Sequence, residues 1–371
     1  MLKIIYIVDF LRTINAGTEN QLSHLLRQLP GLGYSVTLIS LQDSPFIIDE
    51  AGSLFPDVMI QSLGVKSDIS KSLPSIIKLY RILKKEKPDI VHTFFPASNS
   101  IGILLARFSG IKTLISSRRD MGFNLSPMDI LKLRAANRFV SGVIANSNAV
   151  KKKAAQMERI KSEKISVIYN GLDIKSFENR TGVKDNKKEC IVAIVANLNR
   201  EVKRVDLFVK ACAIVHKEHL EVKYQVIGDG HLRESLEQLS SDLGLTSVMA
   251  FMGRRRDVAQ LLEKVTLGVI SSDSEGLSNS IMEYMAMGLP VVATDVGGNA
   301  ELVIDGATGW IVPPDDDLKM AEAVLKIIRS PEKAEQMGQS GYEFIENNFS
   351  IQRMIENTDH FYRKMLGQSD S

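Results

Sequence analysis

The feature that most constrains the fold of this 371-residue chain is an alternation of short apolar runs and amphipathic stretches. The runs are rich in β-branched residues and predict buried strands, whereas the stretches between them predict helices. In the first half, the predicted strands are residues 4–8, 36–40, 90–93, 113–116 and 143–145. The predicted helices are residues 18–28, 73–85, 98–108 and 130–139. This alternation is typical of a parallel sheet covered by helices on both faces.

The same alternation starts again in the second half of the chain. The predicted strands there are residues 191–196, 223–227, 250–252, 267–270, 291–293 and 309–312. The predicted helices are residues 206–216, 232–241, 259–264, 280–287, 318–328 and 331–347. We therefore expect an α/β protein with two doubly wound, Rossmann-like domains facing each other across a cleft. Ligands of such sheets bind beyond the carboxyl ends of the strands.

A polar stretch separates the two series. Residues 181–189 (TGVKDNKKE) contain a glycine and have no apolar period, which is typical of a linker. The predicted domains are therefore residues 1–182 and 183–350. The last segment, residues 349–366, has a partly helical apolar spacing and follows a domain that is already complete, so it can pack elsewhere.

Composition argues against several classes of protein. The two cysteines, Cys190 and Cys212, are far apart, which argues against a disulfide scaffold or a zinc site and suits a reducing compartment. The apolar run at the N-terminus ends at Asp9, so it predicts a strand rather than a signal peptide. No stretch approaches the ~18 apolar residues of a transmembrane helix. We expect a cytoplasmic protein that is at most peripheral at the inner face of the membrane.

Charge is distributed unevenly along the chain. Residues 1–180 hold 25 basic and 15 acidic residues, whereas residues 181–371 hold 21 and 29. A basic first half favours an anionic partner, such as an anionic lipid surface, a lipid diphosphate or an acidic glycan. An uneven but solvated surface explains the same numbers. We expect no nucleic-acid partner.

The strongest motif lies between the predicted strand 267–270 and the predicted helix 280–287. Two glutamates, Glu275 and Glu283, flank a glycine and a run of small polar residues. The glycine lets a ligand approach the backbone, and N–H groups at the start of the helix form an anion site suited to a diphosphate. The binding residues predicted here are Gly276, Leu277, Ser278, Asn279, Ser280 and Glu283.

The two glutamates are expected to do different work. From inside the helix, Glu283 can accept hydrogen bonds from paired ribose hydroxyls, as acidic residues do in dinucleotide sites. Glu275, in the loop, would face the group attached beyond the phosphates. An alternative is that Ser280 and Glu283 form a capping box that merely starts the helix. That alternative does not explain Glu275 or the GGNAE segment at residues 297–301.

Eight segments, taken in order, resemble the motifs of a known family. They are residues 16–19 (AGTE), 88–92 (PDIVH), 167–173 (VIYNGLD), 203–207 (KRVDL), 226–230 (VIGDG), 275–283 (EGLSNSIME), 285–293 (MAMGLPVVA) and 306–312 (GATGWIV). Together they resemble the retaining glycosyltransferases of family 4, which have the GT-B fold and an E-x7-E segment. The resemblance covers nearly the whole chain. Two positions depart from it, because Ala16 and Arg204 stand where glycine is usual.

The resemblance implies transfer of a sugar from a nucleoside-diphosphate sugar to a glycan or lipid-linked acceptor, in polysaccharide or glycoconjugate biosynthesis. It implies retention of configuration, no metal and no required cofactor, and a UDP-sugar is favoured over a GDP- or ADP-sugar as the donor. The first domain would bind the acceptor and be completed by the C-terminal helix, residues 351–371. The second domain would bind the donor.

The resemblance also implies further donor-binding residues, which are Gly17, Arg200, Lys203, Gly228, Gly230 and Arg254. Lys203 and Arg200 would neutralise the leaving diphosphate, which a transferase without a metal requires. A solvated loop is the alternative for these two residues. For the two glycines after residue 227 the alternative is a tight turn, and for Arg254 it is plain surface charge. Glu275 would hydrogen-bond the hydroxyls of the donor sugar.

One departure concerns the reacting centre. Many members carry a histidine after the fourth strand of the first domain, whereas residues 115–122 here read ISSRRDMG. Our hypothesis is that Arg118 or Arg119 orients the donor or an anionic acceptor while Asp120 positions or deprotonates the acceptor hydroxyl. The alternative is an Arg–Asp ion pair that holds the loop. His92 could instead act as a base, although a structural role at the strand end is favoured.

Two other functions stay open at this stage. One is a sugar-nucleotide epimerase of the same fold, which would convert the donor without an acceptor. The other is a non-catalytic nucleotide-sugar-binding protein. A nicotinamide dehydrogenase is disfavoured, because the first turn has no G-x-G-x-x-G, and an NTPase is disfavoured because no G-x-x-x-x-G-K-[ST] occurs.

Overall fold

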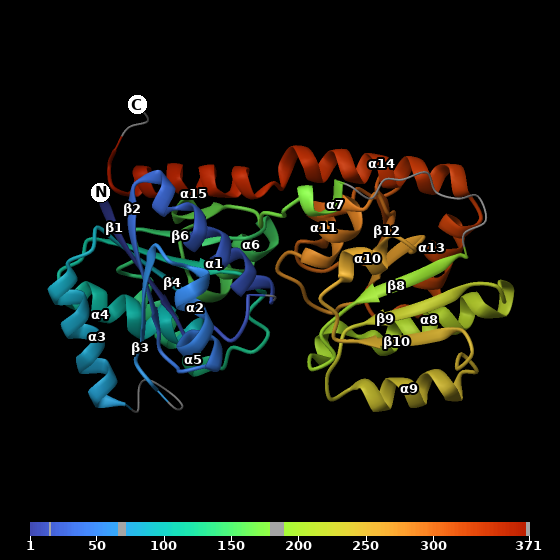
Figure 1. Cartoon of the computed structure of the whole chain (residues 1–371), viewed down its shortest axis with the longest axis horizontal. Coiled ribbons are helices and arrows are strands. Elements are labelled where there is room, and N and C mark those ends of the chain that lie inside the picture. The colour runs from blue at the N-terminus through green and yellow to red at the C-terminus, as the bar shows by residue number, and fades with distance from the viewer. Residues whose placement is uncertain (15, 66–71, 179–188, 369–371) are drawn as a thin grey trace. The chain divides into compact units, whose positions relative to one another are not determined.

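The computed structural model describes residues 1–14, 16–65, 72–178 and 189–368. Its contacts divide the chain into two compact units (Figure 1). The first unit is Met1–Gly171 with Ile351–Ser371, and the second is Leu172–Ser350. The boundary predicted between residues 182 and 183 lies outside the described residues.

The first unit is built on a seven-stranded sheet in the order β3-β2-β1-β4-β5-β6-β7, with every neighbouring pair parallel. The order reverses between β1 and β4, so this is a doubly wound sheet. The strands are β1 (Leu2–Val8), β2 (Tyr34–Ser40), β3 (Val58–Ser62), β4 (Ile90–Phe94), β5 (Thr113–Arg118), β6 (Gly142–Ala145) and β7 (Ile165–Val167).

Helices cover both faces of this sheet. They are α1 (Gly17–Gln28), α2 (Ala51–Leu54), α3 (Leu73–Glu86), α4 (Ile103–Phe108), α5 (Pro127–Ala136), α6 (Asn148–Glu158) and α15 (Ile351–Met365). Shorter turns are η1 (Pro30–Leu32), η2 (Phe46–Glu50), η4 (Ser98–Gly102) and η5 (Ser162–Lys164). Alternate residues of β1 enter two different cores, since Ile4 and Tyr6 lie in one and Ile5 and Ile7 in the other.

The C-terminal helix α15 belongs to the first unit. Its Ile355 and Phe361 lie in the same core as Ile4 of β1. Its Tyr362 hydroxyl is 2.8 Å from the hydroxyl of Tyr6. These contacts join residues more than 300 positions apart in the sequence and attach the end of the chain to its first strand.

The second unit has a six-stranded sheet in the order β10-β9-β8-β11-β12-β13, again with parallel neighbours. The order reverses between β8 and β11. The strands are β8 (Ile191–Val195), β9 (Lys223–Ile227), β10 (Met249–Gly253), β11 (Leu267–Ile270), β12 (Val291–Thr294) and β13 (Gly309–Val312). The helices are α7 (Lys175–Glu178), η6 (Glu201–Lys203), α8 (Val205–Glu218), α9 (Arg233–Asp242), α10 (Val258–Leu262), α11 (Asn279–Ala286), α12 (Asn299–Leu302), α13 (Asp317–Ile328) and α14 (Pro331–Asn348).

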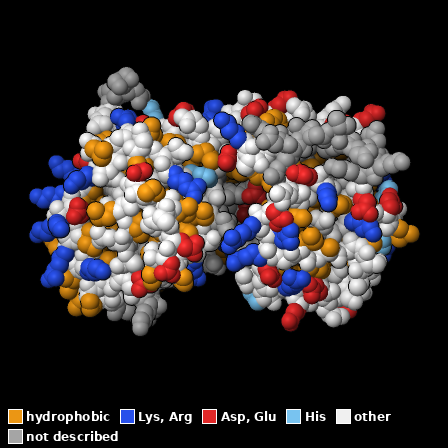
Figure 2. Space-filling view, viewed as in Figure 1, with side chains coloured by type: hydrophobic (Ala, Val, Ile, Leu, Met, Phe, Trp, Pro, Cys, Tyr) orange, Lys and Arg blue, Asp and Glu red, His pale blue; other side chains and the backbone are white. Residues whose placement is uncertain are grey.

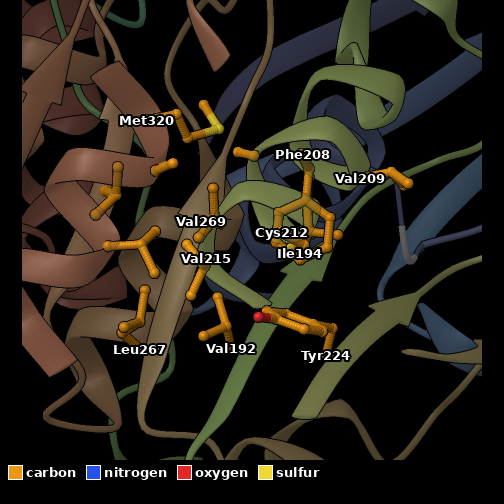
Figure 3. Close-up of a cluster of buried hydrophobic side chains, with 14 of the residues drawn as sticks. Val192, Ile194, Phe208, Val209, Cys212, Val215, Tyr224, Leu267, Val269 and Met320 are labelled. Atoms are coloured by element: carbon orange, nitrogen blue, oxygen red, sulfur yellow. The ribbon is translucent and has the colours of Figure 1, made fainter. Parts of the chain in front are cut away.

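The core of the second unit forms where α8 packs on the middle of its sheet (Figure 3). Phe208 and Cys212 of α8 are buried together with Ile194 of β8 and Val269 of β11. Cys212 is an unpaired thiol, and burial raises its pKa well above the usual value. This cysteine therefore acts as a small apolar core residue.

The predicted fold class, two doubly wound Rossmann-like units, is confirmed. Strands β3 and β7 and helix α6 were not predicted, because their apolar patterns are short. Helix α5 begins at Pro127 rather than at residue 130, since Ser126 and Asp129 form a capping box there. Within the described residues, no helix combines the length and the apolarity that a membrane span requires.

Candidate active site

Each sheet has a point where its strand order reverses, and ligands of doubly wound sheets bind at the carboxyl ends of the strands around that point. In the second unit this point lies between β8 and β11. The loop after β8 carries Arg200 and Lys203, and the loop after β11 carries Glu275. The fold therefore places these predicted residues at one edge of one sheet.

Lys203 and Glu275 lie in direct contact. The Nζ atom of Lys203 donates to Oε1 of Glu275 at 2.6 Å, and the Ser272 hydroxyl donates to the same oxygen at 2.7 Å. The hydroxyl of Ser271 donates to the carbonyl oxygen of Lys203 at 2.9 Å. The two loops are thus joined by a partly buried ion pair and by a hydrogen bond to the backbone.

The glycine-rich segment after β12 packs against the Glu275 loop. A Cβ atom at Gly297 would lie 1.6 Å from the carbonyl oxygen of Glu275, so only glycine fits there. The N–H group of Gly298 donates to the carbonyl oxygen of Gly276 at 3.1 Å. The GGNAE segment that the capping-box alternative left unexplained therefore supports the loop that carries Glu275.

Glu283 lies on α11 and is half-buried. Its carboxyl group makes no hydrogen bond or ion pair with the described residues, and burial raises its pKa to about 7. The capping box is not formed, because α11 begins after Ser278 and Ser280 instead donates to the carbonyl oxygen of Val195 at 3.2 Å. A half-buried carboxyl group without a partner points to a ligand that supplies the missing donors.

The other residues of this unit that are predicted to bind the sugar donor lie at the same edge of the sheet, but their contacts do not point to a ligand. A Cβ atom at Gly228 or Gly230 would collide with the backbone after β8, so tight packing of two loops already accounts for these glycines. Arg200 and Arg254 are exposed, at the start of η6 and directly after β10. Their binding roles stay predictions.

Arg204 is a residue whose role the sequence did not reveal. Its backbone is left-handed, with φ of 47°, at the position where the family usually has glycine. Its guanidinium group contacts Asp206 at 3.0 Å, Asp273 at 3.2 Å and Asp315 at 2.7 Å. Arg204 thereby connects the loops that follow β8, β11 and β13, and its departure from the family pattern was the only sequence signal for this role.

In the first unit, the three charged residues of the ISSRRDMG segment (residues 115–122) contact different partners. Arg118 is buried and donates to both carboxylate oxygens of Glu158 at 2.7 Å, and to Oδ1 of Asn137 at 3.1 Å. Such a saturated buried pair serves structure, so the arginine pairs with Glu158 rather than with Asp120. Asp120 is exposed and accepts a hydrogen bond from the N–H group of Gly122 at 2.8 Å.

Arg119 differs from its neighbour. It donates to Oδ1 of Asn170 at 2.6 Å and forms no ion pair with the described residues. Burial lowers its pKa to about 10. A half-buried cation without a carboxylate partner is costly to hold, so Arg119 is a better candidate for ligand contact than Arg118.

His92 is enclosed on both sides. Its Nδ1 atom is 2.6 Å from the Tyr362 hydroxyl and its Nε2 atom is 2.8 Å from the Ser117 hydroxyl. Burial lowers its pKa to about 3, so the imidazole is neutral at ordinary pH. Because both ring nitrogens are engaged inside the protein, the structural alternative for His92 holds and the general-base alternative does not.

The first unit also contains a cavity of about 410 Å³ at the carboxyl end of its sheet. Arg119 and Asp120 line this cavity, and so does Thr18 in the first turn of α1. Gly17 precedes Thr18 and is exposed. Among the described residues, no three histidine, cysteine or acidic side chains gather in a way that could hold a metal ion.

Solved structures share this architecture over the whole chain. The structure of Anabaena HepE in complex with UDP superposes with a TM-score of 0.83 at 20% identity, over 98% of this chain and 100% of that one. Sucrose-phosphate synthase from Thermosynechococcus elongatus superposes with a TM-score of 0.82 at 20% identity, over 100% of both chains. These superpositions show that the chain has the GT-B fold.

Sequence comparisons identify the family. The family model for glycosyltransferase family 4 matches residues 16–176, and the model for glycosyl transferases group 1 matches residues 189–330. The chain belongs to glycosyltransferase family 4, as the motifs predicted.

Two curated relatives align along almost the whole chain. UDP-Gal:α-D-GlcNAc-diphosphoundecaprenol α-1,3-galactosyltransferase of Escherichia coli is 24% identical over 91% of this chain and 91% of its own length. N-acetyl-α-D-glucosaminyl L-malate synthase of Bacillus anthracis is 25% identical over 94% of this chain and 93% of its own length. Their names describe different acceptors, so the family alone does not select one.

Proposed function

We propose that this chain transfers a sugar from a UDP-sugar to a hydroxyl group of a glycan or lipid-linked acceptor, with retention of configuration and without a metal. In this proposal the second unit binds the donor and the first unit binds the acceptor. The observation that carries it is Glu283, a half-buried carboxyl group without a hydrogen-bond partner among the described residues, with its pKa raised to about 7.

Glu283 is suited to the ribose of the donor. A carboxylate can accept two hydrogen bonds from neighbouring hydroxyls, and these bonds favour its charged form. The first N–H groups of a helix have no carbonyl partner within it, so the start of α11 suits the diphosphate. Gly276, Leu277, Ser278, Asn279 and Ser280 form the approach to this helix start in the proposal.

The diphosphate leaving group carries the charge that develops during transfer. Lys203 is placed to neutralise it, with Arg200 at the other end of η6. In the unliganded structure Lys203 is paired with Glu275. A bound diphosphate would compete for the ammonium group, and Glu275 would then accept hydrogen bonds from the hydroxyls of the donor sugar.

The configuration is retained because the acceptor attacks the anomeric carbon on the same face from which the leaving group departs. The acceptor oxygen bonds to the anomeric carbon, the bond from that carbon to the phosphate oxygen breaks, and the acceptor proton passes to the departing phosphate. No protein nucleophile is required. Arg119 would orient the bound acceptor or donor, and Asp120 would position the acceptor hydroxyl, because both line the cavity of the first unit.

The choice of UDP rests on relatives and structural neighbours. The E. coli relative is named for UDP-galactose. HepE has been solved with UDP and with UDP and glucose, each with a TM-score of 0.83 to this chain, and with UDP-glucose, with a TM-score of 0.81. Each of the three structures matches 98% of this chain. These facts concern those proteins, and they make a UDP-sugar the first donor to test here.

In this proposal the basic charge of the first unit attracts anionic lipid and brings the chain to a membrane surface that presents the acceptor. Figure 2 shows lysine and arginine side chains gathered along the edge of the first unit where α3 lies. Helix α3 contributes Lys78, Arg81, Lys84 and Lys85, all exposed. Sedimentation with vesicles containing anionic lipid, at low and high salt, tests this contact.

The test of the proposed function is a thermal-shift screen with UDP, GDP, ADP, CMP and NAD, followed by their sugar conjugates. A ligand that binds only the folded state raises the unfolding temperature. We expect UDP to stabilise the wild type and Glu283→Ala to abolish the shift. Stabilisation by NAD alone, or by no nucleotide, would contradict the proposal.

Turnover separates the transferase from its rivals. An epimerase would convert the UDP-sugar without any acceptor, and a non-catalytic binding protein would bind it without turnover. We expect transfer that requires an acceptor. Asp120→Ala should lower this transfer while the UDP-induced thermal shift is retained, and unchanged turnover in that variant would remove Asp120 from the mechanism.

A further inference from the structure

Two aromatic rings stack at the switch point of the first unit. Phe10 follows β1 and Phe95 follows β4, the two strands between which the sheet order reverses. Their ring centroids are 4.9 Å apart and their planes differ by 23°. The guanidinium group of Arg12 lies 4.7 Å from the centroid of Phe10. Phe95 is therefore held in one orientation by a neighbour that is itself held by a cation.

The backbone of Phe95 is also unusual. Its φ angle is +73°, in the left-handed region that bulky residues rarely adopt. Such conformations persist only where the surrounding structure imposes them, and they cluster at functional sites. A glycine would adopt this conformation without strain, so the phenyl ring is present despite an energetic disadvantage for the backbone.

Phe95 forms part of the wall of the 410 Å³ cavity. This volume lies in the range of small-molecule sites. The apolar part of the lining includes Ile101 and Leu133, and the polar part includes Asp9 and Asn99. A cavity with one aromatic wall and fixed polar groups matches a ligand that has both an apolar face and hydroxyl groups.

The polar groups of the cavity are held in place. The carboxylate of Asp9 accepts hydrogen bonds from the N–H groups of Ala97 at 3.0 Å and Ser98 at 2.6 Å. The side chain of Asn99 accepts from the hydroxyl of Thr93 at 2.7 Å and donates to a backbone carbonyl oxygen at 2.9 Å. Carboxylate oxygens have further lone pairs, so Asp9 can still accept hydrogen bonds from a ligand.

The charges around the cavity favour a neutral ligand. Arg118 is neutralised by Glu158. The lining then holds two further cations, Arg119 and Lys132, and three carboxylates, Asp9, Asp120 and Asp129. Since neither sign dominates, the cavity is not arranged to concentrate an anion.

We propose that this cavity binds the terminal pyranose ring of the acceptor, with Phe95 against the C–H face of the sugar and Asp9 accepting hydrogen bonds from its hydroxyl groups. This assignment rests on the proposed transferase function and narrows its acceptor to a neutral glycoside. A small carboxylic acid, or a lipid phosphate without a sugar, does not match the aromatic wall and the mixed charge.

The central variant is Phe95→Gly, which removes the ring and suits the left-handed backbone, and its UDP-induced thermal shift reports whether the variant is folded. Phe95→Tyr keeps the ring, and Phe108→Ser, at an exposed phenylalanine on α4, is the matched control. Saturation-transfer NMR with methyl glycosides of glucose, galactose and N-acetylglucosamine reports pyranose binding without nucleotide. Transfer from a UDP-sugar to the same glycosides gives the acceptor KM.

We expect saturation transfer to the ring C–H protons of at least one glycoside in the wild type and in Phe95→Tyr and Phe108→Ser, and its loss in Phe95→Gly. The acceptor KM should rise at least tenfold in Phe95→Gly while the UDP-induced thermal shift stays unchanged. Equal glycoside signals or an equal acceptor KM in wild type and Phe95→Gly would overturn the assignment. So would binding of none of the glycosides, or saturation by L-malate in their place.

The two proposals fail in different ways. A wild-type protein that binds a glycoside through Phe95 but no nucleoside diphosphate would overturn the transferase function and leave the pyranose site. A protein that binds UDP through Glu283 but shows no effect of Phe95→Gly would overturn the pyranose site alone.

Discussion

Replacing Glu283 with glutamine should stabilise the unliganded protein at high pH and weaken nucleotide binding at the same time. Burial raises the pKa of Glu283 from 4.5 to about 7, because its ionised form has no donor among the described residues. The folded state therefore binds a proton that the unfolded state releases between these two values. The free energy of unfolding falls as pH rises from about 4.5 to about 7, and the loss is complete above that window.

The size of the effect follows from the same two pKa values. They correspond to roughly 3 kcal/mol at pH 8, and relaxation or water near the half-buried group will reduce this figure. Glutamine cannot ionise, so Glu283→Gln escapes the penalty. For a unit of this size, a gain on the order of 1–3 kcal/mol raises the unfolding temperature by about 2–10 °C.

Thermal unfolding of wild type and Glu283→Gln at pH 5 and pH 8 measures this directly. We expect similar unfolding temperatures at pH 5 and a more stable variant at pH 8. The control is Glu335→Gln, at an exposed position on α14, which should not reproduce the gain at pH 8. A Glu283→Gln variant that differs from wild type by the same amount at both pH values would refute the reasoning.

The affinity for nucleotide should change with pH in the opposite direction from the free energy of unfolding. Ribose hydroxyls donate to the carboxylate, so binding favours the ionised form and releases a proton below the pKa. The affinity of the wild type for UDP should rise with pH up to about 7 and then level off. Glu283→Gln should bind UDP more weakly and without this pH dependence, which isothermal titration at several pH values would show.

Three further predictions concern ion pairs. Lys203→Ala should lower kcat by about two orders of magnitude, because it removes charge stabilisation of the leaving group. Steady-state kinetics with saturating donor measures this, and an unchanged kcat would contradict the role of Lys203. Arg204→Gly relieves the left-handed backbone but disconnects three loops; we expect the donor KM to rise about fivefold with a nearly constant kcat, and a constant KM would argue against positioning. Glu158→Gln leaves Arg118 buried without a counter-ion and should cost about 3–5 kcal/mol by urea unfolding, whereas a Glu158→Leu, Arg118→Met double variant should recover much of that loss.

The sheet architecture was predictable from local patterns. Apolar β-rich runs of three to six residues determine where buried parallel strands form, because each strand needs both faces covered. The predicted runs therefore coincide with strands such as β1 and β11. Strands β3 and β7 escaped prediction because their side chains are only partly buried, which weakens the apolar signal.

The candidate site was predictable where motif and fold agree. Lys203 follows β8, and both Glu275 and Glu283 follow β11. These two strands are neighbours in one sheet, and parallel strands bring their carboxyl ends to one edge. The sequence could not separate the ligand role of Glu283 from a capping box, since both use the same residue spacing. The backbone decided it, because the N-cap of α11 is Ser278 rather than Ser280, so the helix starts two residues too early for that box to form.

The sequence by itself determined the alternation of strands and helices, the order of the motifs and hence the family. The tertiary structure decided which of two adjacent arginines forms a buried ion pair. Arg118 pairs with Glu158, forty residues away, while Arg119 pairs with no carboxylate among the described residues. It also decided that α15 returns to the first strand and that Phe95 lines a cavity. These outcomes depend on burial and on contacts between distant segments, which local residue spacing does not encode.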